Sequence, residues 1–202
     1  MIVLAGPSGA GKSRLAERLE ARFGWPTLRL DDFYRDGTEA DLPLIARGAN
    51  AGLTDWDHPG SWHENDALKA LLTLCETGTT EIPVYDIAGS RRTGSVTLDL
   101  AGAPYFTAEG IFAPEVVGPC REAGVLAAAY CVTQHPAVTF ARRLHRDLRE
   151  HRKPPPVLVR RGVALARRQR AVVARAVEVG CRVATGDAAY DEIVESLGAP
   201  PR

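Results

Sequence analysis

Eight residues near the start of the chain have the types and the spacing to bind phosphate. Residues 6–13 read GPSGAGKS, which matches the pattern G-x-x-x-x-G-K-[ST] at every fixed position. The glycines let the backbone wrap so closely that its N–H groups point at phosphate oxygens. Lys12 would reach the β- and γ-phosphates, and the hydroxyl of Ser13 would contact Mg²⁺. The pattern predicts a site for ATP with Mg²⁺; a glycine-rich turn without a ligand is the alternative. The expected ATP contacts here are Gly6, Ser8, Gly9, Ala10, Gly11, Lys12 and Ser13.

Carboxylates follow two later apolar segments. Asp31, Asp32 and Tyr34 come directly after residues 27–30, and Glu109 ends another apolar run. Sheets of the α/β class bind ligands at the carboxyl ends of their strands. Phosphoryl transfer to a hydroxyl needs a base for the proton, and a carboxylate can also help to hold Mg²⁺. We expect one aspartate to be this base and Glu109 to bind Mg²⁺ through water. The alternatives are a turn cap for the aspartates and an exposed strand end for Glu109.

A third cluster lies in a long loop that is rich in Gly, Asp and Pro. Residues 54–59 read TDWDHP, a polar and aromatic composition expected of a small-molecule pocket. Asp57 and His58 are the candidate contacts. The alternative is an ordinary turn, in which His58 packs against the protein.

Composition limits the class of protein. The chain has 202 residues, which fits one α/β domain over residues 1–202. Because the loop begins within six residues of Met1 and no apolar run approaches about 20 residues, we expect no signal peptide, no membrane span and a cytoplasmic location. The four cysteines are far apart and form no C-x-x-C pair, so we expect reduced thiols. The sequence does not set the oligomeric state, and a homo-oligomer stays open.

The net charge of zero hides a basic segment. Residues 142–175 carry eleven arginines and one lysine against two acidic residues. ATP would satisfy such a surface, and so would nucleic acid. The segment lacks interleaved aromatic residues and no nucleic-acid recognition module is present, so we expect no nucleic-acid partner.

Short apolar strands alternate with helices, as a parallel sheet with crossover helices requires. We expect strands at residues 2–5, 27–30, 104–112, 126–132 and 181–184. We expect helices at residues 14–23, 65–75, about 137–152, 157–178 and 190–197. A small hairpin outside the main sheet, at about residues 80–102, is predicted from strands at 82–85 and 95–100 joined by a polar loop at 86–94.

Together these motifs resemble the uridine kinase family of P-loop kinases, which is related to phosphoribulokinase. The family's D-S-F-Y motif is matched by residues 31–34, its F-D-H-P motif by 56–59 and its P-V-Y-D segment by 83–86. Its E-G-I segment recurs at residues 109–111, and the R-R-x-x-R-D start of its lid at 142–147. The resemblance covers nearly the whole chain. It implies a P-loop NTPase fold with an Arg-rich helical lid at about residues 142–157.

The resemblance also implies roles for single residues. Asp31 aligns with the family's catalytic aspartate, and would also help to hold the metal. Substrate contacts carry over to Asp31, Tyr34, Asp57, His58, Tyr85 and Arg92. Lys12 and the lid residue Arg146 would neutralise charge on the transferring phosphoryl group. An ATP contact in the lid would come from Arg146, and Arg149 and Arg152 could substitute for lid arginines that this chain lacks, because a guanidinium can clamp phosphate from a nearby position.

Two departures concern the acceptor and the lid. Ser90 stands where the family carries a histidine that contacts the pyrimidine base, and His151 and Lys153 stand where the lid carries arginine. We therefore expect an ATP-dependent kinase for a small metabolite, with the 5′-hydroxyl of uridine or cytidine as the first acceptor to test. A modified nucleoside or a sugar phosphate is the alternative acceptor. An ATP-binding regulatory or nucleic-acid-binding protein is the alternative of another class.

Overall fold

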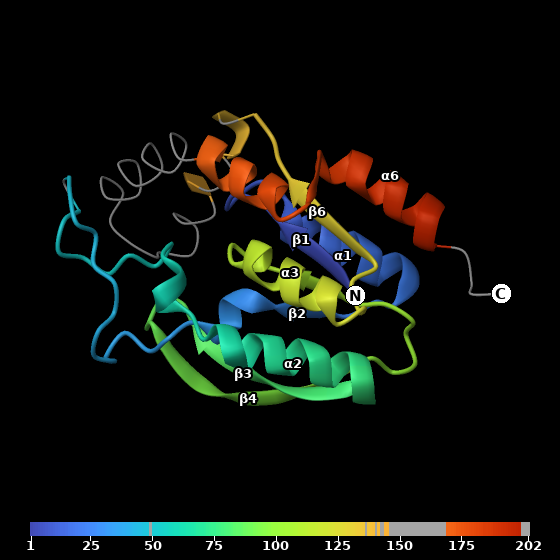
Figure 1. Ribbon diagram of the computed structural model, residues 1–202, viewed down its shortest axis with the longest axis horizontal. Helices are drawn as coiled ribbons and strands as arrows, with labels where there is room; N and C mark the ends of the chain where they lie inside the picture. Colours follow the sequence, from blue (N-terminus) through green and yellow to red (C-terminus); the bar gives the residue numbers. More distant parts are fainter. Residues whose placement is uncertain (49, 136, 140, 142–143, 146–168, 199–202) are drawn as a thin grey trace.

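Five parallel strands form the central sheet of the computed structural model (Figure 1), which describes residues 1–48, 50–135, 137–139, 141, 144–145 and 169–198. The order across the sheet is β2-β5-β1-β6-β7, and every neighbouring pair is parallel. The strands are β1 (Ile2–Ala5), β2 (Thr27–Arg29), β5 (Thr107–Glu109), β6 (Ala128–Val132) and β7 (Arg182–Ala184). The predicted α/β class with a parallel sheet flanked by helices is confirmed.

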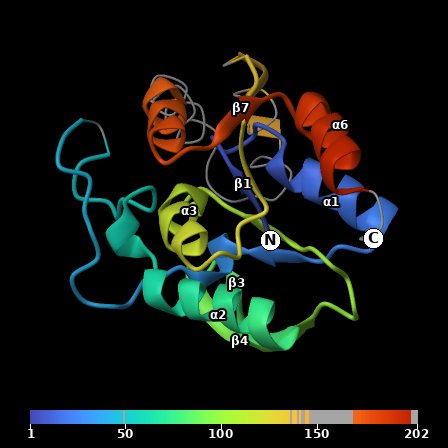
Figure 2. The ribbon, with the colours of Figure 1, turned by 45° about the vertical axis from the view of Figure 1, so that its right-hand side comes forward.

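Strand β1 is buried on both faces because helices cover both sides of the sheet. Val3 and Ala5 point into one core, with α2 (Glu64–Thr77) and α3 (Ala113–Glu122). Ile2 and Leu4 point into the other, with α1 (Lys12–Phe23) and α6 (Gly186–Leu197). Figure 2 shows α1 and α6 together on one side of β1, and α2 and α3 on the other.

Helix α3 is an element that the sequence interpretation missed. It contains Pro114 in its first turn, where a missing N–H costs little, and Pro119 in its interior, where one hydrogen bond is lost. Val116, Val117 and Cys120 are fully buried along its inner side. Burial of this apolar face outweighs the low helix propensity of Pro and Gly.

Several predicted boundaries were wrong. The predicted strand at 104–112 pairs only over β5, and the strand at 27–30 ends at Arg29 because a 3₁₀ turn, η1 (Leu30–Phe33), begins there. Helix α6 starts four residues earlier than predicted. The side chain of Thr185 caps it by accepting a hydrogen bond from the N–H of Ala188.

The predicted hairpin is present, and its two strands are longer than expected. Its strands are β3 (Thr79–Asp86) and β4 (Arg91–Asp99), which form a separate antiparallel sheet of two strands. The loop predicted at 86–94 is therefore only the turn 87–90. Helix α2 packs on β3.

Apart from residues 144–145, the predicted Arg-rich lid lies outside the described residues, as does most of the two predicted helices at 137–152 and 157–178. Of the second helix, residues 169–178 are described and are helical. This segment is tied to α3 by Arg175, whose Nε and Nη2 lie 2.9 and 2.6 Å from the two carboxylate oxygens of Glu115. In the part of the chain that the structure describes, no helix is long and apolar enough to cross a membrane.

Candidate active site

The phosphate-binding loop, residues 6–13, connects the end of β1 to the start of α1. Gly6, Gly9 and Gly11 have φ angles of 128°, 85° and 105°, in the region that residues with a side chain rarely adopt. A Cβ atom on Gly6 would lie 2.2 Å from the carbonyl oxygen of Val132 at the end of β6. Glycine at position 6 is therefore required both by the backbone angle and by the close approach of the neighbouring strand.

Lys12 is the first residue of α1 and is only 7% exposed. Its Nζ donates hydrogen bonds to the carbonyl oxygen of Gly6 at 2.9 Å and to that of Pro7 at 3.4 Å. The loop thus curls around a positive charge at the N-terminal end of a helix, and both features favour a bound anion.

Ser13, at the end of the phosphate-binding loop, faces Glu109, at the end of β5. The hydroxyl of Ser13 donates to Glu109 Oε1 at 3.1 Å. Burial raises the pKa of Glu109, the charge of Lys12 opposes this effect, and the charge of Asp31 adds to it. The carboxylate therefore has a cation and a second carboxylate near it.

These oxygen atoms fit the donor set of Mg²⁺. Magnesium is usually held by one or two carboxylates, a hydroxyl or water, and substrate phosphates rather than by a complete protein cage. Ser13, Glu109 and Asp31 offer this partial set. Among the residues that the structure describes, no group of three or more His, Cys, Asp or Glu side chains could hold a metal ion.

Asp31 and Asp32 are adjacent in η1 but face different parts of the molecule. Asp31 Oδ1 accepts a hydrogen bond from the N–H of Ile111 at 3.2 Å, in the segment that follows β5. A Cβ atom on Gly110 would lie 2.8 Å from the same oxygen, so a glycine lets Asp31 approach this segment. Asp31 is thereby held next to Glu109.

Asp32 is 8% exposed and faces the hairpin. Burial raises its pKa, with the charge of Asp31 acting in the same direction, while Arg29 and a hydrogen bond from the backbone of Tyr85 lower it. The Nε of Arg29 lies 3.8 Å from Asp32 Oδ2. These contacts favour a structural role for Asp32 and leave Asp31 as the aspartate next to Glu109, which accepts the hydrogen bond from Ser13 of the phosphate-binding loop.

Tyr34 lies at the centre of an aromatic cluster. Its ring centroid is 5.6 Å from that of Trp56, 5.7 Å from that of Tyr85 and 5.6 Å from that of Phe112. Its hydroxyl donates to the carbonyl oxygen of Trp56 at 3.0 Å. The structure therefore brings the motifs at 31–34, 56–59 and 83–86 together, although they are far apart in sequence.

Tyr85 reaches across from β3. Its hydroxyl donates to the carbonyl oxygen of Arg35 at 2.8 Å. Burial and the nearby carboxylates of Asp36, Glu39 and Asp86 raise its pKa to about 12. The phenol therefore stays protonated at neutral pH.

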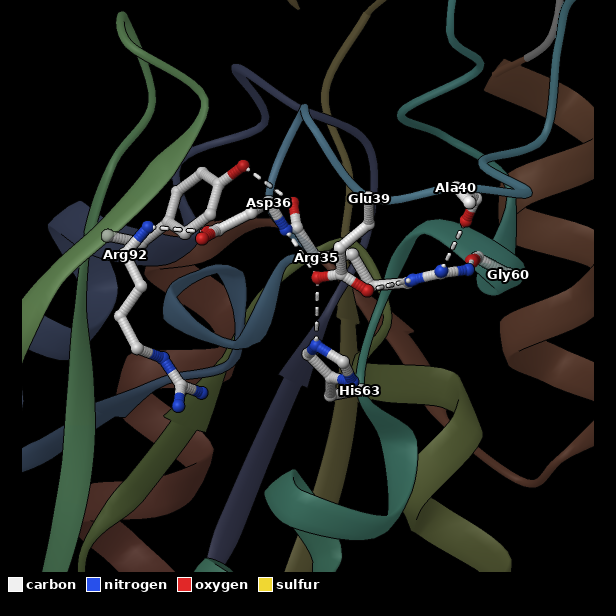
Figure 3. A network of polar contacts seen from close by, with 8 residues as sticks. Arg35, Asp36, Glu39, Ala40, Gly60, His63 and Arg92 are labelled. Atoms are coloured by element: carbon white, nitrogen blue, oxygen red, sulfur yellow. Dashed lines mark hydrogen bonds and ion pairs between the residues drawn. The ribbon is translucent and has the colours of Figure 1, made fainter.

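The other predicted substrate residues have local partners. His58 Nδ1 accepts a hydrogen bond from the N–H of Gly60 at 3.0 Å and caps the 3₁₀ turn η2 (Pro59–Ser61), which is the turn role that the sequence left open. The backbone N–H of Asp57 donates to Asp55 Oδ1 at 3.3 Å. The N–H of Arg92 on β4 donates to Asp36 Oδ1 at 2.6 Å (Figure 3). The lid residues Arg146, Arg149 and Arg152 lie outside the described part of the chain.

Two residues at the site were not predicted. Arg29 is exposed at the end of β2, next to buried Leu28. Its proximity to Asp32 results from the 3₁₀ turn that follows, which the sequence did not predict. Trp62 stacks on Phe112 with ring centroids 5.1 Å apart, and its Nε1 donates to the carbonyl oxygen of Leu30 at 2.7 Å. The sequence signal for Trp62 is an isolated aromatic residue just before an amphipathic helix.

Known proteins resemble this chain in sequence and in fold. The model of the phosphoribulokinase / uridine kinase family matches residues 1–153. The chain belongs to this family. Among its members, the uridine kinase of Saccharomyces cerevisiae is 28% identical over 151 residues, which are 73% of this chain and 29% of that protein.

Two further proteins resemble this chain, one over about half of its length and the other over most of it. The inorganic pyrophosphatase TTM2 of Arabidopsis thaliana is 31% identical over 113 residues, which are 56% of this chain and 15% of that protein. A crystal structure of a putative fructose transport system kinase from Silicibacter sp. TM1040 has a TM-score of 0.54 at 19% identity, and the match covers 92% of this chain and 86% of that one. This likeness supports the P-loop kinase fold. The chain spans less than a third of the length of the curated relatives.

Proposed function

We propose that this chain is a P-loop kinase that transfers the γ-phosphoryl group of ATP to a hydroxyl of a small metabolite. The observation that carries the proposal is the convergence of Lys12, Ser13, Asp31 and Glu109, from three separate motifs, at one end of the parallel sheet. Burying a lysine and a carboxylate costs the desolvation of both charges, and a turn without a ligand has no need of such a pair.

The proposed reaction assigns one task to each residue. The loop N–H groups and Lys12 bind the phosphates, and Ser13 and Glu109 would hold Mg²⁺, which would neutralise charge on the phosphates. The acceptor oxygen forms a bond to the γ-phosphorus as the bond to the β–γ bridging oxygen breaks and ADP leaves. The hydroxyl proton goes to the carboxylate of Asp31. Arg146 of the lid would stabilise the charge on the transferring group.

The acceptor proposed first is the 5′-hydroxyl of uridine or cytidine. Family membership and the retained Asp57 and Tyr85 support a nucleoside-like acceptor, whereas Ser90 lacks the stacking surface of histidine. A site without a partner for one polar group loses on the order of 1–3 kcal/mol, or about tenfold to a hundredfold in relative efficiency. We therefore expect weak discrimination among bases, and Ser90→His should sharpen the preference toward uridine and cytidine.

An acceptor panel tests this function. The value of kcat/KM would be measured with ATP and Mg²⁺ for uridine, cytidine, a purine nucleoside, ribose-type sugars and sugar phosphates. The Lys12→Ala variant is the negative control, because it removes the charge that would face the phosphates, and a thermal melt would verify that it is folded. Activity on sugar phosphates alone would transfer the proposal to that acceptor class. ATP turnover that is stimulated by nucleic acid and by no metabolite would contradict a metabolite kinase.

A further inference from the structure

Residues 35–39 follow η1 closely and contact the hairpin (Figure 3). The end of the sheet that holds Asp31 and Glu109 is called the catalytic end below. The carbonyl oxygen of Arg35 accepts a hydrogen bond from the hydroxyl of Tyr85 at 2.8 Å, and Asp36 Oδ1 accepts one from the N–H of Arg92 at 2.6 Å. One contact holds β3 and the other holds β4. The loop that follows η1 therefore fixes both strands of the hairpin near its turn.

The same loop has no spare room at Gly37. Its N–H donates to the carbonyl oxygen of Ser90 at 2.7 Å, in the hairpin turn. A Cβ atom at position 37 would lie 3.1 Å from the Cβ of Ser90 and 3.8 Å from the ring of Trp56. The loop, the hairpin turn and the aromatic cluster are thus in direct contact.

The side chain of Glu39 binds two residues of this loop. Its Oε2 accepts a hydrogen bond from Arg35 Nε at 2.9 Å, and its Oε1 accepts the N–H of Asp36 at 2.8 Å. The Nε2 of His63, at the start of α2, lies 3.5 Å from Oε1 (Figure 3). Arg35 and Asp36, which both bind the hairpin, are therefore each hydrogen-bonded to a different carboxylate oxygen of Glu39.

Arg35 is also anchored to the body of the protein. Its Nη1 donates to the carbonyl oxygen of Gly60 at 3.1 Å and its Nη2 to that of Ala40 at 2.8 Å. Burial raises the pKa of Glu39, but hydrogen bonds from Arg35 and Asp36 and the nearby His63 outweigh burial and leave that pKa lowered. Glu39 is thus ionised at neutral pH and can accept on both oxygens.

We propose that Glu39 is a positioning residue, which holds Arg35 and Asp36 so that the hairpin residues Tyr85 and Arg92 stay fixed against the catalytic end of the sheet. Its effect on acceptor binding rests on the proposed function, whereas its effect on the hairpin does not. The contacts described for Glu39 join it to Arg35, Asp36 and His63, and none of these belongs to the phosphate-binding loop. Nucleotide binding should therefore not depend on it.

The test variant is Glu39→Gln. A carboxamide has one acceptor oxygen, so its NH₂ group must face either Arg35 Nε–H or the N–H of Asp36, both of which are donors. One of the two hydrogen bonds is then lost while the side-chain volume is kept. Glu64→Gln is the control, because it removes the same charge from an exposed position next to His63. A thermal melt would verify that both variants are folded.

Hydrogen–deuterium exchange gives the first measurement. In Glu39→Gln, peptides covering residues 35–40 and 84–93 should exchange about tenfold faster, the change expected from losing about one net hydrogen bond. Peptides covering residues 6–16 and the Kd for Mg·ATP should stay unchanged. Unchanged exchange of residues 84–93, or the same acceleration in Glu64→Gln, would overturn the proposal.

Steady-state kinetics give the second measurement. With the best acceptor of the panel, Glu39→Gln should raise the acceptor KM about tenfold while the KM for ATP and kcat stay within about twofold. Faster hairpin exchange with an unchanged acceptor KM would show that the hairpin does not set acceptor binding, and would overturn that part. If no panel member is phosphorylated by the unmodified protein, the proposed function fails, and the exchange measurement alone decides the positioning role.

Discussion

Asp31 and Asp32 show how neighbouring residues of one type can differ in role. Asp31 lies beside Glu109 and the segment after β5, whereas Asp32 is buried against the hairpin and Arg29. We expect Asp31→Asn to lower turnover by at least ~10², the typical loss for a missing general base, with little effect on the Kd for ATP. Steady-state assays of both asparagine variants test this. An active Asp31→Asn next to an inactive Asp32→Asn would reverse the assignment.

Glu109 gives a prediction about pH. Its pKa is raised above 4.5 by burial, so the folded state binds the proton more tightly than the unfolded state. The ionised side chain therefore lowers stability as the pH rises from about 4.5 through the raised pKa. Glu109→Gln lacks this titration, although it can still accept from Ser13.

The stability of Glu109→Gln relative to the unmodified protein should consequently increase as the pH rises through that window and then level off. Thermal melts in the absence of nucleotide, from pH 4.5 to 8, measure the difference. A difference that is independent of pH, or that falls with rising pH, would show that Glu109 is not held at a raised pKa. Activity should fall in the same variant, since a possible ligand to Mg²⁺ is lost.

At the scale of elements, Gly118 allows a test of how low helix propensity limits the stability of α3. Gly118 lies within it, and a Cβ atom there would meet nothing within 4 Å. Gly118→Ala should therefore stabilise the protein by about 0.5–1 kcal/mol through helix propensity and a less flexible unfolded chain. Urea unfolding measures this change. Gly6→Ala is the contrasting variant, because its Cβ would meet a carbonyl oxygen at 2.2 Å, and it should lose stability and nucleotide binding.

The elements also show which features the sequence could predict. Residues 2–5 are apolar at every position and the glycine-rich loop follows at once, so β1, the loop and α1 were predictable. Helix α3 was not, because Pro114, Gly118 and Pro119 oppose a helix locally and only its packing against the sheet offsets them. The contacts of Asp36 and Glu39 were not predictable either, since they depend on how the hairpin folds back.

The candidate site divides in the same way. Lys12, Ser13 and Glu109 belong to motifs whose positions at strand ends bring them together in any sheet of this topology. The motifs at 31–34, 56–59 and 83–86 were predicted as separate clusters, and the structure joins them through Tyr34. His58 shows the limit, because its role as a turn cap depends on the local backbone.

At the scale of the whole molecule, the account depends on the basic segment that follows β6. We expect Arg146→Ala to reduce turnover by more than it weakens ATP binding without acceptor, because a closing lid meets the γ-phosphoryl group mainly in the reacting complex. Comparison of kcat with the Kd for Mg·ATP tests this. An equal loss in both would indicate that Arg146 binds the ground state and the transition state alike.

The most direct measurement of the central claim follows the γ-phosphoryl group itself. The protein would be incubated with Mg²⁺ and γ-labelled ATP, with uridine or the best acceptor of the panel, and the label would be traced by chromatography to the acceptor or to inorganic phosphate. We predict that the label appears in the phosphorylated acceptor in equal amount to ADP, and that Asp31→Asn slows this transfer by at least ~10². Label that appears only as inorganic phosphate, at the same rate with and without acceptor, would contradict a phosphotransferase.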